Sequence, residues 1–554
     1  MKIGIINDLP MLPSLNYLFS GLETIVEKHQ TFRRPPEYLH ASNVRREEMT
    51  KELILKSDVI VGTMDEMMLQ TRERVGKHVP YVWFPFASVT RSFPDMRHNH
   101  QYFKSTDIIV CHCEAEVEIT RKFFTNARLR YVPFIYDDSI FYPLEEASRQ
   151  AVKAEMGFGP DDKILLYVGR IAVEKNVQTV LKIFSVVQNL IPNVHLVVVG
   201  RASESPFAEF GVFPLNLIGT LTKMYRTLGI PKEKIHFIDN KAPAELRNLY
   251  SAADAVFNLT LNHDENFGLA QVEAMGCGTP VVGTNWGGLK DTIIDGETGY
   301  KVSTFASSAL GVKVDWWEGA HKLVSLLTAK ESERLRFRRR SQEHVYGKFS
   351  LAPFTQAINS ILAEAAELKE GESEQLELTP FAREFFGVCV PLLGRLPSYR
   401  LSAHTYDLYR QLIAPFTGST QEGEADTNGH LSTGQTLCLA NPVVINDDGS
   451  VSVDDLIYPI RLPLPEAHRE RVLAALEAMR EEPIIKVERL IGVYLSGHPT
   501  AIDALTWMLD AGLILKTLAG DGRVTLRDVG MKMSTPLYSV QRINPMAVDV
   551  VVVG

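Results

Sequence analysis

Cysteine is scarce in this chain of 554 residues, and long hydrophobic runs are absent. The five cysteines are odd in number and form neither a CxxC pair nor a zinc-type spacing, which favours a reducing compartment over a disulfide scaffold. No apolar run approaches the roughly 18 residues of a transmembrane helix, and Met1–Pro10 does not have the form of a signal peptide. We therefore expect a cytoplasmic protein whose contact with a membrane, if it has one, is peripheral.

An excess of positive charge is also lacking. The formal net charge is −9, so bulk electrostatics predict no non-specific binding of nucleic acid. The hydrophobic share of 45% and the charged share of 23% are typical of soluble globular proteins. Because the chain is too long for one hydrophobic core, we expect two or three domains.

Short apolar strands alternate with helical stretches through most of the chain, which predicts parallel sheets covered by helices. One such set occupies residues 1–145, and a second begins after Glu145. The predicted strands lie at 2–7, 58–63, 79–84, 107–113, 163–169, 194–200, 234–238, 255–259 and 279–283. The fold class is therefore α/β, with two doubly wound, Rossmann-like domains in tandem. Ligands of such sheets bind outside the carboxyl ends of the strands, so the cleft between the domains is the expected site.

The last part of the chain has a different character. Residues 468–530 predict three helices and then a hairpin around Ala519–Arg523. This order resembles a winged helix in outline, so we expect a mainly helical domain. Residues 380–554 carry 15 basic and 20 acidic side chains, a net charge of −5, which makes a poor DNA-binding module. A module that docks a protein partner or an acceptor is the better hypothesis.

The first motif that indicates chemistry runs from Gly169 to Lys175, between a predicted strand and a predicted helix. Gly169 permits a tight turn and a close backbone approach. Arg170 and Lys175 place two cations near a helix N-terminus, an arrangement that suits a diphosphate. Surface salt bridges are the alternative interpretation.

The second motif runs from Glu265 to Glu273. A helix is expected to begin near Phe267, so that the backbone N–H groups of Phe267, Gly268 and Leu269 form an anion site. Glu265 stands just outside this helix, where it can meet sugar hydroxyls. Glu273 lies about two turns deeper and suits the vicinal hydroxyls of a ribose. The alternative is an acid that stabilises the helix dipole, followed by a solvated glutamate.

These motifs, together with Ala274–Val282, Gly287-Gly288 and the Asp295-Gly-x-x-Gly299 turn, resemble the donor half of retaining glycosyltransferases of family 4, which have the GT-B fold. Pro133-x3-Asp137-x3-Phe141-x-Pro143 resembles the crossover between the two domains of that family. The resemblance is detailed over about 130–305 and does not extend beyond about 370. It implies an acceptor-side domain at 1–145, a donor domain at 146–370 whose last helix (353–368) crosses back to the first domain, and an accessory domain at 371–554.

The resemblance also implies roles for single residues. Arg170 and Lys175 would bind the donor diphosphate, Glu265 would contact the donor sugar, and Glu273 the ribose. The backbone contacts to the donor would come from Gly169, Asn266, Phe267, Gly268 and Leu269. The implied activity is metal-independent, retaining hexosyl transfer from a UDP- or GDP-sugar as co-substrate, without a cofactor, to an unidentified acceptor. A nucleotide-sugar epimerase and a donor-binding scaffold or regulator are the alternatives.

The acceptor half departs from the family pattern. Residues 7–15 lack the Gly-Gly loop that often follows the first strand, and Thr63 and Phe86 stand where many members have histidines. No catalytic histidine can therefore be carried over. His98 and His100 are candidates for acceptor contacts, or are exposed loop histidines.

Two further features have competing interpretations. The strand end Cys111-His112-Cys113 belongs either to the core or, less favourably, to a metal site. The basic run Arg334–Arg340 is either a solvated helix face or a contact with anionic lipid.

Overall fold

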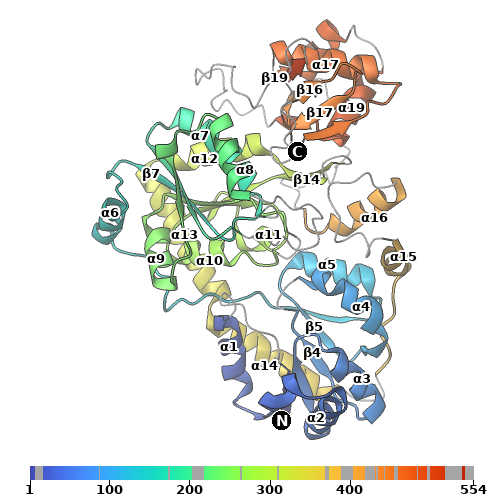
Figure 1. Cartoon of the computed structure of the whole chain (residues 1–554). Coiled ribbons are helices and arrows are strands. Elements are labelled where there is room, and N and C mark those ends of the chain that lie inside the picture. Colours follow the sequence, from blue (N-terminus) through green and yellow to red (C-terminus); the bar gives the residue numbers. More distant parts are fainter. Residues whose placement is uncertain are drawn as a thin grey trace.

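The computed structural model describes most of the chain (Figure 1). The described residues are 1–6, 16–85, 88–172, 175–202, 217–262, 265–307, 311–368, 373–388, 403–417, 431, 435–441, 443–454, 459–482, 484–495, 500–517 and 540–542. Within them, no helix is both long enough and apolar enough to cross a bilayer.

The first domain is built on a six-stranded sheet in the order β2-β1-β3-β4-β5-β6, with every neighbouring pair parallel. Its strands are β1 (Lys2–Ile6), β2 (Gln30–Arg33), β3 (Val59–Gly62), β4 (Tyr81–Trp83), β5 (Ile108–Cys111) and β6 (Arg128–Tyr131). Its helices are α1 (Asn16–Val26), α2 (Asn43–Lys56), α3 (Glu66–Val75), α4 (Phe93–Asn99) and α5 (Glu114–Phe123), with short 3₁₀ turns η2 (Pro36–His40), η3 (Val89–Ser92) and η4 (His100–Tyr102). Helical crossovers are what parallel strands require.

The second domain repeats this plan in the order β12-β11-β10-β7-β8-β9, again with all neighbours parallel. Its strands are β7 (Lys163–Val168), β8 (Val194–Val199), β9 (Ile235–Ile238), β10 (Ala255–Asn258), β11 (Val281–Thr284) and β12 (Gly299–Val302), followed by the antiparallel pair β13 (Thr304–Ser307) and β14 (Gly311–Val314). Its helices are α6 (Glu146–Glu155), α7 (Val177–Leu190), α8 (Leu217–Thr227), α9 (Pro243–Ala252), α10 (Leu269–Gly276), α11 (Leu289–Thr292), α12 (Trp316–Leu327) and α13 (Glu331–Phe349), with the turn η6 (Lys232–Lys234). The predicted pair of parallel-sheet α/β domains is confirmed.

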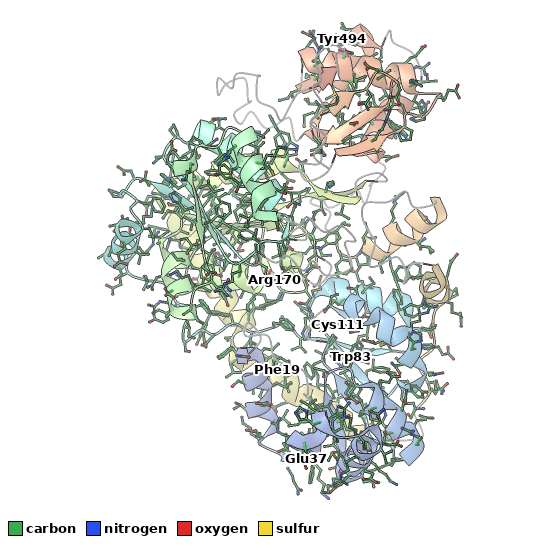
Figure 2. All side chains as sticks on the ribbon, in the orientation of Figure 1. Phe19, Glu37, Trp83, Cys111, Arg170 and Tyr494 are labelled. Atoms are coloured by element: carbon green, nitrogen blue, oxygen red, sulfur yellow. The ribbon has the colours of Figure 1, made fainter. Side chains whose placement is uncertain are left out.

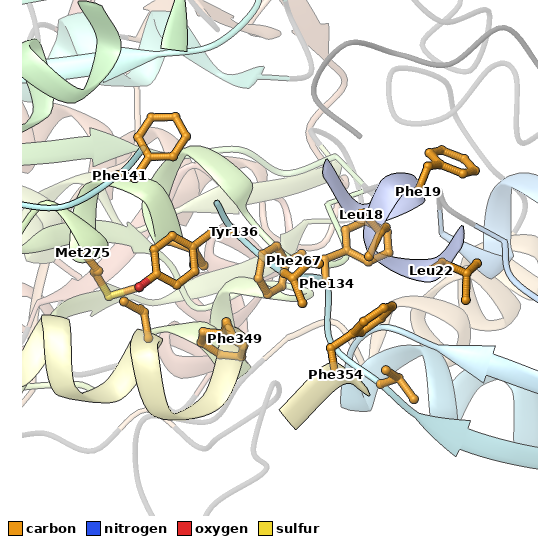
Figure 3. Packing of buried hydrophobic residues seen from close by; sticks show 14 of the residues in the cluster. Leu18, Phe19, Leu22, Phe134, Tyr136, Phe141, Phe267, Met275, Phe349 and Phe354 are labelled. Atoms are coloured by element: carbon orange, nitrogen blue, oxygen red, sulfur yellow. The ribbon is translucent and has the colours of Figure 1, made fainter. Parts of the chain in front are cut away.

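Helix α14 (Leu351–Glu367) returns from the second domain to the first, where the sequence places a helix at 353–368. Its buried residues Ile358, Ile361 and Leu362 share one core with strand residues of the first sheet. On the polar side, the Glu364 carboxylate accepts from Arg128 Nη1 at 3.1 Å. This core also crosses between the domains, because Phe267 packs on Phe134 and on Phe349, with ring centroids 5.7 and 5.2 Å apart (Figure 3).

After residue 373 the chain forms α15 (Pro380–Val388) and α16 (Ala403–Ile413), and then a C-terminal module, which we define as the described part of 435–542. The module has a three-stranded sheet, β19-β15-β20, and a four-stranded sheet, β18-β17-β16-β21. Its strands are β15 (Thr436–Leu439), β16 (Val443–Ile445), β17 (Val451–Asp454), β18 (Pro459–Leu462), β19 (Ile484–Lys486), β20 (Ile514–Thr517) and β21 (Val540–Arg542). Its helices are α17 (Arg469–Glu481), α18 (Val487–Arg489), the π-helix η9 (Leu490–Tyr494) and α19 (Ala501–Asp510).

The winged-helix outline is not confirmed by this part of the chain. Strands in two sheets accompany the helices, so the described module is mixed rather than mainly helical. The hairpin expected around Ala519–Arg523 lies outside the described residues.

Candidate functional site

Two glycines end neighbouring strands where the first motif begins. Gly169 follows β7 and Gly200 follows β8, with φ angles of +152° and +148°. The Gly169 N–H donates to the Val199 carbonyl at 3.0 Å, and a Cβ on Gly200 would lie 1.9 Å from the Gly169 oxygen. The backbone is therefore close-packed at the carboxyl edge of the sheet, and Arg170 comes directly after it. Figure 2 places Arg170 on the side of the second domain that is turned toward the first domain.

Lys175 and Glu265 meet, although ninety positions separate them in the chain. The Lys175 Nζ lies 2.5 Å from the Glu265 Oε2, and the two side chains are 18% and 13% exposed. The other carboxylate oxygen, Oε1, accepts the Gly268 N–H at 3.0 Å. The structure thus joins the first and second motifs through one partly buried ion pair at the start of α10.

Helix α10 begins at Leu269, two residues later than the sequence predicts. Gly268 precedes it in the left-handed conformation, with φ +81° and ψ +58°. Of the three N–H groups expected to face an anion, that of Gly268 donates to the Glu265 carboxylate. The Phe267 side chain is 2% exposed and lies in the core between the domains.

The Asn266 side chain reaches the first domain. Its Nδ2 donates to the Glu116 Oε1 at 3.3 Å, and both residues are buried. Glu116 also accepts the N–H groups of His112 at 2.6 Å and Val89 at 3.1 Å, and burial raises the pKa of its carboxyl to about 7. Sequence reasoning missed Glu116, although an acid in the first turn of a helix that follows a buried strand was a usable signal.

The segment that begins with the glycine pair Gly287-Gly288 and runs to Asp291, which we call the third motif, supports the second. Gly288 donates its N–H to the Glu265 carbonyl at 2.8 Å, and a Cβ on Gly288 would lie 2.1 Å from the Asn266 carbonyl carbon. Asp291 of the same motif accepts the Glu114 N–H, at the start of α5, at 2.7 Å. Burial raises the pKa of Asp291 to about 6. The glycine pair and Asp291 therefore fix the Glu265 loop and connect it to the first domain.

Glu273 lies on α10, partly buried, beside Tyr250. The Tyr250 hydroxyl donates to its Oε2 at 3.0 Å, and burial raises the pKa of the Glu273 carboxyl to about 8. A carboxyl with that pKa is mostly protonated at pH 7. Its predicted contact with a ribose stays a prediction.

The two candidate histidines lie on or next to α4. His98 is exposed, and the His100 Nδ1 lies 3.2 Å from the carbonyls of Met96 and Arg97. The hydrogen bonds and ion pairs described for these two histidines do not reach the Lys175–Glu265 pair. Their role at the acceptor stays a prediction, and Phe86 lies outside the described residues.

Cys111 and Cys113 are both buried in one hydrophobic cluster of the first domain. The His112 Nδ1 lies 2.8 Å from the Val132 carbonyl, and burial lowers the pKa of this imidazole to about 3. Among the described residues, no group of three or more His, Cys, Asp or Glu side chains is placed to hold a metal ion.

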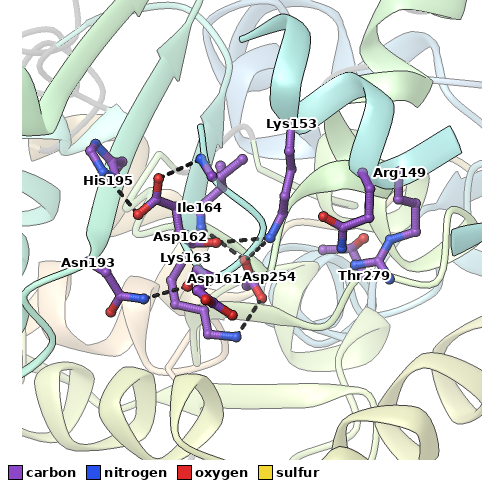
Figure 4. A network of polar contacts seen from close by, with 12 residues as sticks. Arg149, Lys153, Asp161, Asp162, Lys163, Ile164, Asn193, His195, Asp254 and Thr279 are labelled. Carbon is purple, nitrogen blue, oxygen red and sulfur yellow. Dashed lines mark hydrogen bonds and ion pairs between the residues drawn. The ribbon is translucent and has the colours of Figure 1, made fainter. Parts of the chain in front are cut away.

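A second buried charge network lies at the amino ends of the strands of the second sheet, opposite the carboxyl ends where Gly169 lies (Figure 4). Asp254 pairs with Lys153 at 3.1 Å and with Lys163, the first residue of β7, at 3.3 Å. It also accepts the Ile164 N–H at 3.0 Å. This network joins the amino ends of β7 and β10, away from Gly169, and is structural.

The basic run lies on α13. Four of its arginines have glutamate partners: Arg334 with Glu331, Arg336 with Glu333 at 3.8 Å, Arg339 with Glu343 at 3.6 Å, and Arg340 with Glu343 at 3.5 Å and Glu297 at 3.7 Å. This pairing favours the solvated helix face over a lipid contact, which stays untested.

Comparison with known proteins agrees with the motifs. Residues 148–325, which lie within the second α/β domain, match the family model described as Glycosyl transferases group 1. The chain is 31% identical over 252 residues to a D-inositol 3-phosphate glycosyltransferase of Segniliparus rotundus, and the aligned region covers 45% of this chain and 50% of the relative. It is 28% identical over 221 residues to a mannosylfructose-phosphate synthase of Agrobacterium fabrum, and here the aligned region covers 39% of this chain and 46% of the relative. The chain thus spans about half the length of the curated relatives it matches.

Solved structures are more distant. A sucrose-phosphate synthase (tll1590) from Thermosynechococcus elongatus is 16% identical, with a TM-score of 0.49, and the match covers 66% of this chain and 98% of that one.

Proposed function

We propose that this protein is a retaining, metal-independent glycosyltransferase that moves a sugar from a UDP- or GDP-sugar to an acceptor still to be identified. The observation that carries the proposal is the Lys175–Glu265 pair at the start of α10, beyond the carboxyl ends of the parallel strands β7 and β10. The match to glycosyl transferases group 1 and the glycosyltransferase and synthase names of the two relatives support it.

The contacts of Glu265 suggest how a diphosphate is held. The carboxylate already pairs with an ammonium and with a backbone N–H at a helix start, which are the partners that a phosphate prefers. A donor diphosphate, with more charge, would replace it at Lys175 and gain Arg170 as a second cation. Glu265 would then be released to accept hydroxyls of the donor sugar.

The reaction we propose needs no protein base. The acceptor hydroxyl attacks the anomeric carbon on the face that the diphosphate leaves, so a new C–O bond replaces the old one with retention. The hydroxyl proton passes to the departing phosphate oxygen. The protein then acts mainly by stabilising the charge on the leaving diphosphate, through Lys175, Arg170 and the amino end of α10. This scheme fits a first domain onto which no catalytic histidine can be carried over.

The decisive experiment compares two lysines of the same domain. Wild-type protein is titrated calorimetrically with UDP- and GDP-sugars, alongside Lys175→Ala and Lys163→Ala. Loss of a charge-assisted hydrogen bond, worth about 1.5–3 kcal/mol, should weaken donor binding about 10- to 100-fold in Lys175→Ala. Lys163→Ala should bind the donor as the wild type does, because Lys163 lies at the amino end of β7 and the candidate site lies beyond its carboxyl end.

The outcomes separate the alternatives. No binding or hydrolysis of any nucleotide sugar would overturn the proposal. Donor binding without transfer to any acceptor would indicate a scaffold or regulator. Conversion of the donor into an isomer without an acceptor would indicate an epimerase. If a product forms, NMR of its anomeric centre tests retention.

A further inference from the structure

Residues 373–388 are fastened to the first domain. The Ser105 N–H donates to the Glu374 carbonyl at 2.7 Å, and the Thr125 N–H donates to the Glu377 carbonyl at 3.0 Å. Helix α15 then places three aromatic rings against Phe123, with centroid distances of 5.2 to 5.5 Å: Phe381, Phe385 and Phe386. Both the backbone and the side chains of this segment are thus anchored on α5 and its surroundings.

The residues that follow helix α16 lie on the second domain. The Phe416 ring stacks on Trp286, with centroids 5.4 Å apart and an interplanar angle of 24°, and both rings are fully buried. The Phe416 carbonyl accepts the Gly287 N–H at 2.9 Å. The Lys290 Nζ donates to the Pro415 carbonyl at 2.6 Å. A segment beyond the matched domain therefore packs directly on the Trp286–Gly288 loop.

This loop holds the residues on both sides of the Glu265 turn. The Trp286 Nε1 donates to the Asn262 carbonyl at 3.0 Å, and the Gly288 N–H donates to the Glu265 carbonyl at 2.8 Å. Gly287 has φ +52°, and a Cβ there would lie 2.5 Å from the Glu265 oxygen. The Glu265 backbone is therefore hydrogen-bonded to the Trp286–Gly288 loop. That loop in turn packs on the Phe416 ring and donates a hydrogen bond to the Phe416 carbonyl.

We infer that Phe416 is a positioning residue for the sugar-nucleotide site, and that the C-terminal extension completes a site which the matched domain at 148–325 does not complete alone. The inference rests on the proposed function. A carboxylate that must meet a substrate within a fraction of an ångström depends on the stiffness of its loop. Removing the Phe416 ring opens a cavity beside Trp286 and loosens this loop without touching Lys175 or Arg170.

The test uses the full-length protein with Phe416→Ala, Phe416→Leu and, as a control, Phe381→Ala. Phe381 is a ring of the same size in the same extension, but it packs on Phe123 of the first domain. Amide hydrogen exchange of the peptide 262–275 is measured without ligand, and donor affinity is measured by calorimetry. We expect Phe416→Ala to speed exchange in this peptide and to weaken donor binding about tenfold, which corresponds to about 1.4 kcal/mol. Phe416→Leu, which keeps most of the apolar volume, should show a smaller change in both.

Each result decides between the alternatives. Exchange and affinity unchanged in Phe416→Ala would overturn the inference, as would equal loosening of 262–275 by Phe381→Ala, which would mean general destabilisation. If Phe416→Ala does not fold, Phe416→Leu gives the answer. If the wild type binds no nucleotide sugar, the proposed function fails, while the exchange comparison still decides whether Phe416 holds the loop.

Discussion

Burial raises the pKa of Glu273 to about 8 from an ordinary value of 4.5, even though Tyr250 donates to this carboxyl. Between these two values the unfolded chain has lost a proton that the folded protein keeps, so the contribution of Glu273 to stability falls as pH rises. Glutamine has the same shape, keeps an acceptor for Tyr250 and does not titrate. We predict that Glu273→Gln gains stability over the wild type as pH rises from 5 to 8, by about 1.4 kcal/mol for each unit at most.

Thermal unfolding at pH 5, 6.5 and 8 checks this prediction. The control is Glu245→Gln, because a hydrogen bond from Lys241 lowers the pKa of the exposed Glu245 carboxyl. The Glu245→Gln variant should show no such gain. A stability difference between Glu273→Gln and wild type that stays constant with pH would contradict the burial of the carboxyl.

At the scale of single residues, the sequence predicted which residues belong to the candidate site better than it predicted the contacts between them. It placed Lys175 and Glu265 at one site, and the structure brings them to 2.5 Å. It did not predict that Glu265 also accepts the Gly268 N–H, or that Asn266 pairs with Glu116 of the other domain. These contacts depend on loop conformation and domain packing, which motif spacing does not encode.

Among the elements, the adjoining ends of β7 and β8 depend on glycine. Gly200 has a positive φ, and a Cβ there would lie within 2 Å of the Gly169 oxygen. We predict that Gly200→Ala displaces the Gly169–Arg170 turn and weakens donor binding. The change should lower the free energy of unfolding by about 1–3 kcal/mol. Denaturant unfolding and donor titration measure the two effects.

The matched control is Gly347→Ala on α13, where a Cβ has no heavy atom within 4 Å. This variant should be more stable by about 0.5–1 kcal/mol, since glycine is a poor residue inside a helix. If Gly200→Ala has the stability and the donor affinity of the wild type, the two strand ends can separate without loss of either, and the prediction is wrong.

Buried elements were more predictable than partly exposed ones. Most strands of both parallel sheets stand out because they are buried on two faces, whereas the partly exposed edge strands β2, β6 and β12 were not predicted. The start of α10 was misplaced by two residues, because the left-handed Gly268 ends the preceding loop. In the C-terminal module, strands of three or four residues pair across the chain, and such short runs carry no period that separates them from helix.

At the scale of the whole molecule, the C-terminal module is docked on the second domain. Cys438, Ala440 and Leu515 belong to that domain's buried core, and the Trp316 Nε1 donates to the Ala440 carbonyl at 3.0 Å. The buried Lys182 Nζ donates to the Asn441 side chain at 3.1 Å. A role for residues 380–554 in binding a protein partner stays a proposal, but the surface that meets α7 and α12 is occupied.

We predict that Leu515→Asp undocks this module, because it places an unpaired carboxylate in an apolar contact that is 4% exposed in the wild type. Small-angle scattering should show a larger radius of gyration, and thermal unfolding should separate into two transitions. The neighbouring change Lys516→Ala, at a half-buried position of the same strand, should leave both the radius of gyration and the thermal unfolding curve as they are in the wild type. An unchanged radius for Leu515→Asp would show that the contact does not hold the module.

The sequence by itself determined the two α/β domains, the glycines that end their strands and the charged residues gathered beyond them. These are local properties, because a buried strand, a tight turn and a helix start each depend on a few consecutive side chains. Only the tertiary structure decided that Glu265 pairs with Lys175, that Asn266 reaches Glu116, and that Phe416 stacks on Trp286 from far along the chain. Those contacts join segments tens to hundreds of residues apart, and their geometry follows from how whole domains pack against one another.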